Sequence, residues 1–394
     1  MISILNFLQW IFFLLTMCGT IYLLVFAVAG FIYRPVKFSS SDKFRKFAVF
    51  IPGYKEDNVI VDIARKALDQ DYPQDCYDVI VIADGFKKET IEKLKELPII
   101  VNEVIFEKSS KAKSLNKTME ELPDEYEVAL VLDADNIMAT DFISKMNHAY
   151  NNGYIAIQGH RLAKNSNTHF AVLDALSEEI NNNIFRRGHR KLGLSAALIG
   201  SGMAFNYQIY KTLMSQIESF GEDKELEHKL LKRKIKIEYL DNALVYDEKT
   251  TKSQVFVTQR TRWIANQLNF ATNYLGEGFN ELFKGNIDFF DKIVQHLIPP
   301  RIFIVGFLLI ILIISLIFNP ISWSYAWLIQ CIMCSVALFI SVPKKLFTLK
   351  TLNALLYLPL GFFLMLISLT KINQARKGFA HTTHTFNEND NHNL

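Results

Sequence analysis

The chain has 394 residues, and its 43 Lys and Arg residues nearly cancel its 40 Asp and Glu residues, which leaves a formal net charge of +3. A charge so close to balance does not indicate a nucleic-acid partner. Half of the residues are hydrophobic, a share that is high for a wholly soluble protein and that indicates contact with a membrane.

The first predicted element is a transmembrane helix over residues 1–33. This segment contains no charged side chain, and its apolar run exceeds the roughly 20 residues that a helix needs to cross a bilayer. Ala27 and Ala29 have the spacing of a signal-peptide cleavage site, but no basic residue precedes the run, and the run is too long. We therefore favour a membrane anchor over a cleaved signal peptide.

Residues 34–285 have the composition of a soluble domain in which strands and helices alternate. The expected strands are 46–52, 77–85, 99–106 and 126–136, and the expected helices between them are 57–70, 87–97 and 111–122. Strands this apolar are buried on both faces, which is typical of a parallel sheet covered by helices. The sequence thus predicts an α/β domain.

Polar residues follow three of these strands, at the positions where each strand ends. They are Tyr54, Lys55 and Glu56 after the first strand, Asp84 after the second, and Asp133 and Asp135 after the fourth. Ligands of such sheets bind at the carboxyl ends of the strands. Because alternate residues of a strand share a face, Asp133 and Asp135 can share one divalent cation. A solvated turn before the next helix is the alternative, and Asp84 favours the metal site.

Three downstream stretches carry further polar chemistry. The stretch "ALIGSGMAFN" has glycines where the backbone must approach a ligand or another strand. The stretch "GEDKELEHKLLKRK" begins a helix with Glu222 and Asp223, and carboxylates in that position often serve only to complement the helix dipole. The stretch "QRTRW", residues 259–263, brings an amide, two guanidinium groups and an indole together before the chain becomes apolar again.

The last part of the chain is predicted to lie in and on the membrane. Residues 286–300 mix apolar and charged side chains and read as an interfacial amphipathic helix. Apolar stretches at 302–318, 321–342 and 352–369 are each long enough to cross or nearly cross a bilayer. We expect two to three spans over residues 301–371 and a polar tail over residues 372–394.

Basic residues next to membrane spans tend to remain in the cytoplasm. Arg34 and Lys37 follow the first span, so the α/β domain is predicted to be cytoplasmic and the protein to be an integral membrane protein of the inner or plasma membrane. Three full crossings after that domain would export the basic tail, against the same rule. Either the segment 352–369, which contains "LPLG", does not cross fully, or the tail is exported.

The order of these motifs resembles a known family. "IPGYKED", "VIADG", "KAKSLN", "LDADN", "GSGMAF", "GED" and "QRTRW", followed by membrane segments, are similar to the inverting family 2 glycosyltransferases of the membrane polysaccharide synthase type. Cellulose, chitin, hyaluronan and poly-N-acetylglucosamine synthases belong to that group. The resemblance implies a hexosyltransferase with a GT-A fold, which is a Rossmann-like domain that binds nucleotide sugars.

The resemblance also implies roles for individual residues on the donor side. Tyr54, Lys55, Glu56 and Asp84 would hold the nucleoside of a UDP-sugar, Lys111 would lie near the phosphates, and Asp133 and Asp135 would bind the nucleotide through Mg²⁺ or Mn²⁺. A departing diphosphate needs the cationic stabilisation that such a set provides.

On the acceptor side, the resemblance makes Asp223 the general base, since an acceptor hydroxyl is a poor nucleophile until its proton is removed. Gln259, Arg262 and Trp263 would lie beside the donor diphosphate and the acceptor sugar. Trp263 offers a flat apolar face for a pyranose ring. An interfacial membrane anchor is the alternative for this residue, because Trp collects at headgroup level.

The resemblance therefore predicts transfer from a UDP-sugar, with inversion, to a growing β-linked polysaccharide. The chain has fewer predicted membrane spans than the large synthases, so export of the product could require a partner subunit or a homo-oligomer. Transfer of a single sugar to a lipid acceptor is the alternative, and the membrane lipids are partners in either case. A non-enzymatic sugar-nucleotide sensor or transporter subunit is disfavoured, because a sensor has no need of Asp223 or Gln259.

Overall fold

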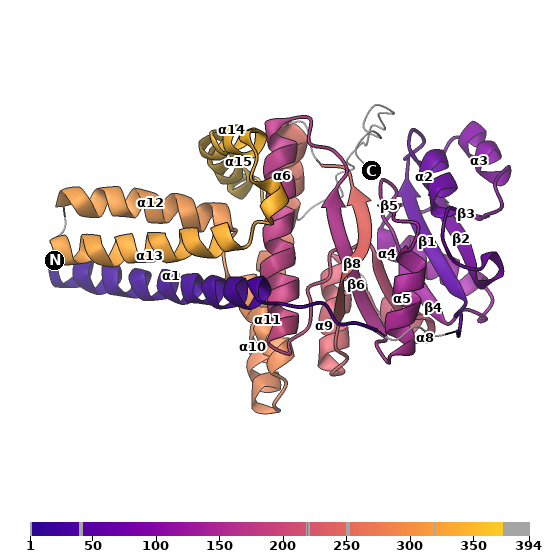
Figure 1. Ribbon diagram of the computed structural model, residues 1–394, viewed down its shortest axis with the longest axis horizontal. Coiled ribbons are helices and arrows are strands. Elements are labelled where there is room, and N and C mark those ends of the chain that lie inside the picture. The colour runs from indigo at the N-terminus through magenta and orange to yellow at the C-terminus, as the bar shows by residue number, and fades with distance from the viewer. Residues whose placement is uncertain are drawn as a thin grey trace.

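The computed structural model describes residues 2–38, 42–217, 219, 221–249, 253–318 and 320–372. The predicted polar tail beyond Ile372 lies outside the described residues. An α/β domain forms one end of the molecule, long apolar helices project from the other end, and two further long helices lie between these parts (Figure 1).

The first half of the sheet follows the sequence prediction. The parallel strands are β1 (Phe47–Tyr54), β2 (Tyr77–Asp84), β3 (Ile100–Val104) and β4 (Val128–Val131). The elements between them are α2 (Ile60–Ala67), the short 3₁₀ turn η1 (Gln74–Cys76), α3 (Lys88–Lys95) and α4 (Lys111–Glu121). Tyr54 and Asp84 are register partners at the carboxyl ends of β1 and β2, so the polar residues that follow these strands meet at one edge.

The second half of the sheet departs from the parallel arrangement. Its strands are β5 (Ile137–Met138), β6 (Ala156–Ala163), β7 (Met203–Asn206) and β8 (Glu238–Asp247), and the full order is β3-β2-β1-β4-β7-β6-β8-β5. Strand β7 is antiparallel to both of its neighbours, β4 and β6. Between β6 and β7 the chain passes through the helical residues 169–191 and then through Gly200 and Gly202, which both have positive φ. The sheet is therefore mixed rather than wholly parallel.

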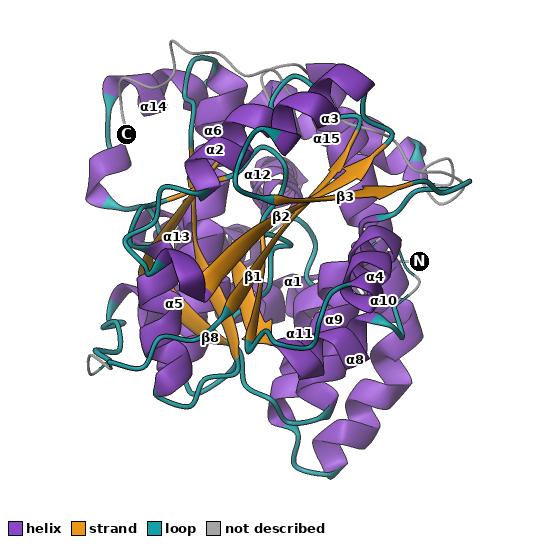
Figure 2. Ribbon diagram, turned by 90° about the vertical axis from the view of Figure 1, so that its right-hand side faces the viewer, coloured by secondary structure: helices purple, strands orange, loops and turns teal. Residues whose placement is uncertain are grey.

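Helices cover both faces of this sheet, as the apolar strands predicted (Figure 2). Val49 and Ile51 of β1 pack in one core with α2 and α5 (Phe142–Asn151). Phe50, which points the other way, packs in a second core with α4, α8 (Tyr207–Met214) and α9 (Glu222–Lys232). Alternate residues of one strand are thus buried on opposite faces.

Helices that lie between the domain and the long apolar helices connect these two parts. Helix α6 (His169–Asn181) continues through the π-helical segment η2 (Asn182–Gly188) into α7 (His189–Lys191). Asn183 in this segment donates to the Ala27 carbonyl at 3.0 Å and to Ser341 Oγ at 2.9 Å. Gly30 allows this close contact, since a Cβ there would lie 2.3 Å from the Asn183 carbonyl oxygen.

Helix α10 (Ser253–Phe283) runs beside α6 and leads into α11 (Ile287–Leu297), which occupies the segment predicted to be an interfacial amphipathic helix. Helix α11 packs against α9 and α10 and buries Phe289 and Ile293, while Ile287 and Leu297 are exposed.

Three helices are long and apolar enough to span a membrane among the described residues: α1 (Ile2–Phe31), α12 (Arg301–Phe318) and α13 (Ile321–Ile340). They lie side by side in Figure 1. The turn η3 (Lys344–Leu346) then leads to α14 (Leu349–Leu355) and α15 (Leu358–Thr370), which are bent by 49° relative to each other.

The pair α14 and α15 differs from the long helices. Helix α15 has 13 residues. Its length is about 20 Å, shorter than the roughly 30 Å hydrocarbon core of a bilayer. It packs against α10 and α12, and the pair stays near α6 without reaching the far end of the bundle, where α1 begins (Figure 1).

Candidate active site

One cavity of about 1640 Å³ runs from the carboxyl ends of the first strands to the apolar helices α12, α13, α14 and α15. Ten of the eleven residues singled out from the sequence line it: Tyr54, Glu56, Asp84, Lys111, Asp133, Asp135, Asp223, Gln259, Arg262 and Trp263. Lys55 does not line the cavity. Its Nζ lies 5.1 Å from the centre of the Tyr54 ring, and its backbone has a positive φ of 55°. The structure therefore brings together residues as far apart in the sequence as Tyr54 and Trp263.

Asp84 marks the end of the cavity at β1 and β2. The residue is buried, and its Oδ2 accepts no hydrogen bond from any described residue. Burial raises the pKa of this carboxyl, against the opposing effect of hydrogen bonds from Ser109 and Ser114. A buried carboxylate oxygen without a donor costs free energy, so this atom is suited to an N–H or O–H donor of a ligand in the cavity.

Asp133 and Asp135 do not lie on an extended strand, contrary to the geometry that the sequence implied. Strand β4 ends at Val131, and the Asn136 N–H donates to the Asp133 carbonyl in a turn. Asp133 Oδ1 accepts from Lys111 Nζ at 2.5 Å, whereas Asp135 Oδ1 accepts from Asn136 Nδ2 at 3.0 Å. Both side chains nevertheless line the cavity, because the turn carries them past the end of the strand.

These two carboxylates fit a divalent metal that takes its other ligands from a substrate. Within the described ranges there is no cluster of three or more His, Cys, Asp or Glu residues that could hold a metal ion. Mg²⁺ is usually bound in this open way, through one or two carboxylates together with substrate phosphates and water. Asp133 and Asp135 are the residues that would hold the ion.

Lys111, the first residue of α4, is surrounded by acceptors. Its Nζ lies 2.5 Å from Asp133 Oδ1, 2.6 Å from the Gly200 carbonyl and 3.5 Å from Glu222 Oε1. Burial by itself would lower the pKa of Lys111, but Asp133 and Glu222 outweigh it and raise that pKa. Burial also raises the pKa of Glu222, to which Asp223 and Asp133 add and which Lys111 opposes. The lysine therefore remains a cation in the cavity.

Asp223 lies in the first turn of α9, next to this cluster. Its Oδ1 accepts from the Lys224 N–H at 2.9 Å. A Cβ placed on Gly200 would lie 3.7 Å from Asp223 Oδ2 and 3.9 Å from Lys111 Nζ, so the glycine loop, the lysine and the aspartate meet at one point. The sequence predicted only that these motifs belong to one site, and the geometry places Asp223 beside Lys111.

The "QRTRW" motif forms the cavity wall on α10. Gln259, Arg262 and Trp263 line the cavity, and no described residue hydrogen-bonds or ion-pairs with Arg262. Arg260, to which the sequence assigned no role, ion-pairs with Asp174 of α6, and its Cζ lies 4.1 Å from the centre of the Trp263 ring. Arg260 thus stabilises the position of the indole, while Arg262 keeps its guanidinium available for an anion.

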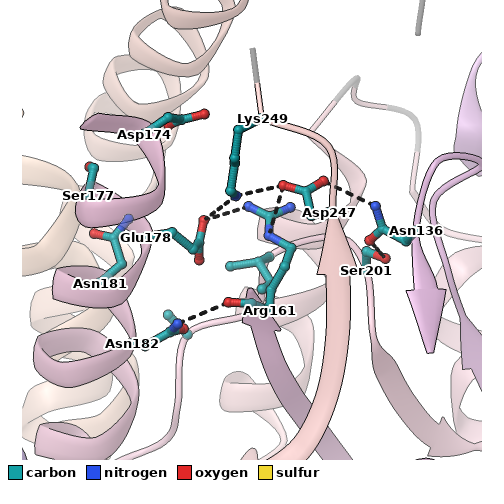
Figure 3. Close-up of polar contacts among 12 residues, drawn as sticks. Asn136, Arg161, Asp174, Ser177, Glu178, Asn181, Asn182, Ser201, Asp247 and Lys249 are labelled. Carbon is teal, nitrogen blue, oxygen red and sulfur yellow. Dashed lines mark hydrogen bonds and ion pairs between the residues drawn. The ribbon is translucent and has the colours of Figure 1, made fainter. Parts of the chain in front are cut away.

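Next to Asp133 and Asp135 lies a buried polar network that we did not predict from the sequence (Figure 3). Asp247 Oδ1 accepts from Asn136 Nδ2 at 3.1 Å, and its Oδ2 accepts from Lys249 Nζ at 2.6 Å. Arg161 lies 3.8 Å from Asp247 and donates to Glu178 of α6 at 2.8 Å. The loop of Asp135 is thereby connected to α6.

The charges of this network compensate each other. Burial would raise the pKa of Asp247, but Lys249 and Arg161 outweigh it and lower that pKa. Arg161, Lys249 and Arg186 lower the pKa of Glu178 in the same way. Asp247 could have been found as a strand-end carboxylate, because it is the last residue of β8. Arg161 and Glu178 carry no sequence pattern that distinguishes them from surface charges.

Among curated proteins there is no match. Among solved structures, the chain is similar to a mannosyltransferase from Pyrobaculum calidifontis in complex with GDP-Man and Mn²⁺, at 14% identity and a TM-score of 0.48, covering 82% of this chain and 99% of that chain. It is also similar to residues 1–349 of TarS from S. aureus, at 14% identity and a TM-score of 0.41, covering 84% and 91%.

A third likeness is to glucosyl-3-phosphoglycerate synthase from Mycobacterium tuberculosis in complex with Mn²⁺, UDP and glucosyl-3-phosphoglycerate. It has 13% identity and a TM-score of 0.39, and it covers 57% of this chain and 79% of that chain. At such low identities and TM-scores, these likenesses carry no conclusion about the present site.

The family assignment comes from the sequence itself. Residues 45–266, which include every predicted site residue, match the model of the family described as glycosyltransferase like family 2. The mixed α/β sheet with helices on both faces agrees with the Rossmann-like GT-A fold predicted for such a domain. The protein is therefore a glycosyltransferase, and its chain belongs to glycosyltransferase family 2.

Proposed function

We propose that the protein transfers a sugar, with inversion, from a UDP-sugar to the hydroxyl group of a growing β-linked polysaccharide at the membrane surface. The observation that carries this proposal is the single cavity in which Asp133, Lys111, Asp223, Arg262 and Trp263 meet. These side chains supply a metal-binding carboxylate, cations for a leaving diphosphate, a base and a flat surface for a sugar ring.

On the donor side, Asp84 Oδ2 would accept a hydrogen bond from the nucleoside, and Tyr54 and Glu56 line the same end of the cavity. Lys111 and Arg262 would bind the diphosphate oxygens, which are the leaving group of the reaction. A divalent metal held by Asp133 and Asp135 would neutralise the negative charge that develops on that leaving group.

On the acceptor side, Asp223 would take the proton of the attacking hydroxyl. The hydroxyl oxygen bonds to the anomeric carbon as the bond from that carbon to the UDP oxygen breaks. A single displacement of this kind inverts the configuration, so an α-linked donor gives a β-glycoside. Trp263 would support the acceptor ring, with Arg260 fixing the other side of the indole.

Transfer of a single sugar to a lipid is the second candidate. It is favoured by the extension of the cavity between apolar residues of α12 and α15, such as Val305 and Phe362. Both candidates use the same donor site and the same base.

We also infer that the catalytic domain is cytoplasmic and that α14 and α15 return to its side of the membrane. Lys345, after α13, lies 3.8 Å from Glu179 of α6, and Lys350 donates to Ser166 at 3.1 Å. At the end of α15, Ser368 donates to the Val257 carbonyl of α10. Both ends of the pair thus contact the catalytic domain. Three crossings then leave every basic loop on one side, as the positive-inside rule requires.

The experiment that tests the proposal is a donor screen with the full-length protein in lipid nanodiscs. UDP-glucose, UDP-N-acetylglucosamine, UDP-galactose and UDP-glucuronate are each supplied with Mn²⁺, and UDP release and product size are measured together. A ladder of products from one donor is the expected result. A single-sugar lipid product would favour the second candidate, and UDP binding without turnover of any of the four donors would contradict both.

A further inference from the structure

The cavity has a second half that the transfer reaction does not use. Beyond Trp263 it continues along membrane-facing helices and is lined by apolar side chains. Those contributed by α12, α13, α14 and α15 include Ile302, Val305, Leu309, Ile310, Leu338, Phe339, Leu352, Leu355, Leu358, Phe362 and Phe363. A soluble sugar nucleotide has no group that matches such a surface.

This apolar half reaches only part of the way across a bilayer. The α12 residues that line it begin at Arg301 and end at Ile310, whereas Leu316 of the same helix lies outside the lining. At 1.5 Å per residue, this stretch of α12 is about 14 Å long, or about half of the roughly 30 Å hydrocarbon core. The described helices thus form a pocket in the leaflet next to the catalytic domain rather than a channel through both leaflets.

The same pocket is accessible from the side. Leu309 is 51% exposed, Ile310 is 44% exposed and Phe363 is 62% exposed, although all three line the cavity. Apolar side chains on the outside of membrane helices are in contact with acyl chains. A hydrocarbon chain can therefore pass from the bilayer into the pocket between α12 and α15 without crossing polar surface.

Arg301 lies where the polar and apolar halves meet. Its guanidinium donates to Asn181 Oδ1 at 2.5 Å, to Ser177 Oγ at 3.0 Å and to the Ser177 carbonyl at 3.1 Å, so its partners on α6 are neutral. No described carboxylate lies within ion-pair distance of it, whereas Arg260 of α10 is paired with Asp174, which lies about one turn before Ser177 on α6. A guanidinium has five N–H donors and binds phosphate oxygens particularly well, so Arg301 retains donors for an anion.

We propose that the acceptor is a lipid whose hydroxyl-bearing headgroup is joined to its apolar tail through a phosphate. The tail occupies the pocket between α12 and α15, Arg301 binds the phosphate, and the headgroup extends past Trp263 to Asp223. This inference rests on the proposed function and specifies its acceptor, whether the headgroup is a single polyol or a glycan that grows. The transfer step is unchanged: the headgroup oxygen bonds to the anomeric carbon, its proton goes to Asp223, and UDP leaves.

The first test follows the label from a radioactive UDP-sugar. The full-length protein is placed in nanodiscs made from the total lipid of the membranes that express it, with Mn²⁺, and UDP release is recorded in parallel. We expect label in the organic extract that moves to the aqueous phase when phosphate esters are cleaved chemically. Label that stays in the organic phase after this cleavage, or that occurs only in a water-soluble polymer, would overturn the inference while leaving sugar transfer intact. Absence of both UDP binding and UDP release would overturn the proposed function itself.

The second test uses variants of the phosphate contact. Arg301→Gln should raise the KM for the extracted lipid acceptor roughly tenfold or more, because a hydrogen bond to a charged group is lost. Arg301→Lys should raise this KM less, because the positive charge is kept. Lys350→Gln is a matched control, since Lys350 is a nearby basic residue that does not line the cavity. UDP affinity should not change in any of these variants. An Arg301→Gln protein with wild-type acceptor KM, or with UDP affinity reduced to the same extent, would contradict the phosphate contact.

The third test fills the tail pocket. Leu309→Trp should lower lipid transfer at least about tenfold with UDP affinity unchanged, because the larger side chain occupies space that the tail needs. Leu316→Trp is the control, since this residue is on the same helix, is also exposed and does not line the cavity. Equal activity of the two variants would show that no tail occupies the pocket.

Discussion

Lys111 and Asp133 are ion-paired across the cavity, with Lys111 Nζ 2.5 Å from Asp133 Oδ1. The lysine comes from the start of α4 and the aspartate from the turn after β4, so the pair fixes one element against the other at the point where a diphosphate would bind. A ligand that brings a metal to Asp133 must share this carboxylate with Lys111 or displace it. The pair would therefore connect nucleotide binding to metal binding.

The first prediction concerns that metal. Asp135→Ala should remove the dependence of UDP binding on Mg²⁺ or Mn²⁺, because one of the two carboxylates that would hold the ion is lost. Calorimetric titration of UDP with and without each ion measures this dependence. Asp141→Ala is a suitable control, since Asp141 pairs with Lys145 outside the cavity. If the variant binds UDP with undiminished metal dependence, Asp135 is not a ligand.

The second prediction concerns the base. Asp223→Asn should lower the transfer rate by about 10² or more, the size of a general-base contribution, while UDP binding is retained. The amide is close to the carboxylate in shape but cannot take a proton from the acceptor. Radiolabel transfer and UDP affinity are measured on the same preparation, with the exposed Asp124→Asn as control. Full activity of Asp223→Asn would refute the assignment.

The third prediction concerns the network of Figure 3. Lys249 is 2% exposed at its side chain and neutralises Asp247 and Glu178 at 2.6 and 3.7 Å. Lys249→Met keeps the volume but leaves these acids with less positive charge, which should cost about 3–5 kcal/mol of stability. Thermal unfolding in detergent measures the loss. Lys95→Met breaks an exposed ion pair with Glu103 and should cost only about 0–1 kcal/mol. Similar unfolding temperatures for the two variants would contradict the role of the network.

The fourth prediction concerns pH. Burial lowers the pKa of His228 to about 4, and burial together with His228 lowers that of His296 well below its usual value. The two rings stack, with centroids 5.2 Å apart, between α9 and α11. The folded protein keeps them neutral, while the unfolded chain binds protons below its ordinary histidine pKa. Stability is therefore retained above pH 6.5 and falls as pH decreases toward 4, by about 1.4 kcal/mol per pH unit for each proton.

His228→Phe keeps a stacked ring and removes one of these titrations. The unfolding temperature of the variant should consequently fall less steeply between pH 6.5 and 5 than that of the wild type. Half-buried His148 provides the control, since it lies on α5, away from the stacked pair of His228 and His296. Parallel curves for the wild type and His228→Phe would show that His228 is not responsible.

Much of the fold could be predicted because its determinants are local. The runs before Tyr54 and Asp84 are apolar apart from Asp78 near the start of β2, and such runs are buried on both faces. The antiparallel direction of β7 could not be predicted in this way. It depends on the pairing of β7 with β4 and β6 in the assembled sheet, which local propensity does not specify.

The residues of the cavity likewise divide into those that a sequence motif identifies and those that only the fold brings together. Asp133 and Asp223, which line the cavity, were predicted as site residues because they belong to short motifs, but their distance from Lys111 is a property of the assembled fold. Arg161 and Glu178 pair only because β6 is packed against α6, and neither is marked in the sequence. Arg301 likewise looks like an ordinary flanking charge until the neutral partners on α6 are seen.

The central claim, inverting transfer from a UDP-sugar, is tested most directly by the anomeric configuration of the product. The purified protein is supplied with its preferred α-linked UDP-sugar and Mn²⁺. The coupling constant of the anomeric proton at the newly formed glycosidic bond is then measured by NMR on the intact product. The account predicts a β-linked product formed in equal amount to the UDP released. An α-linked product would contradict the single displacement and the role of Asp223 as its base.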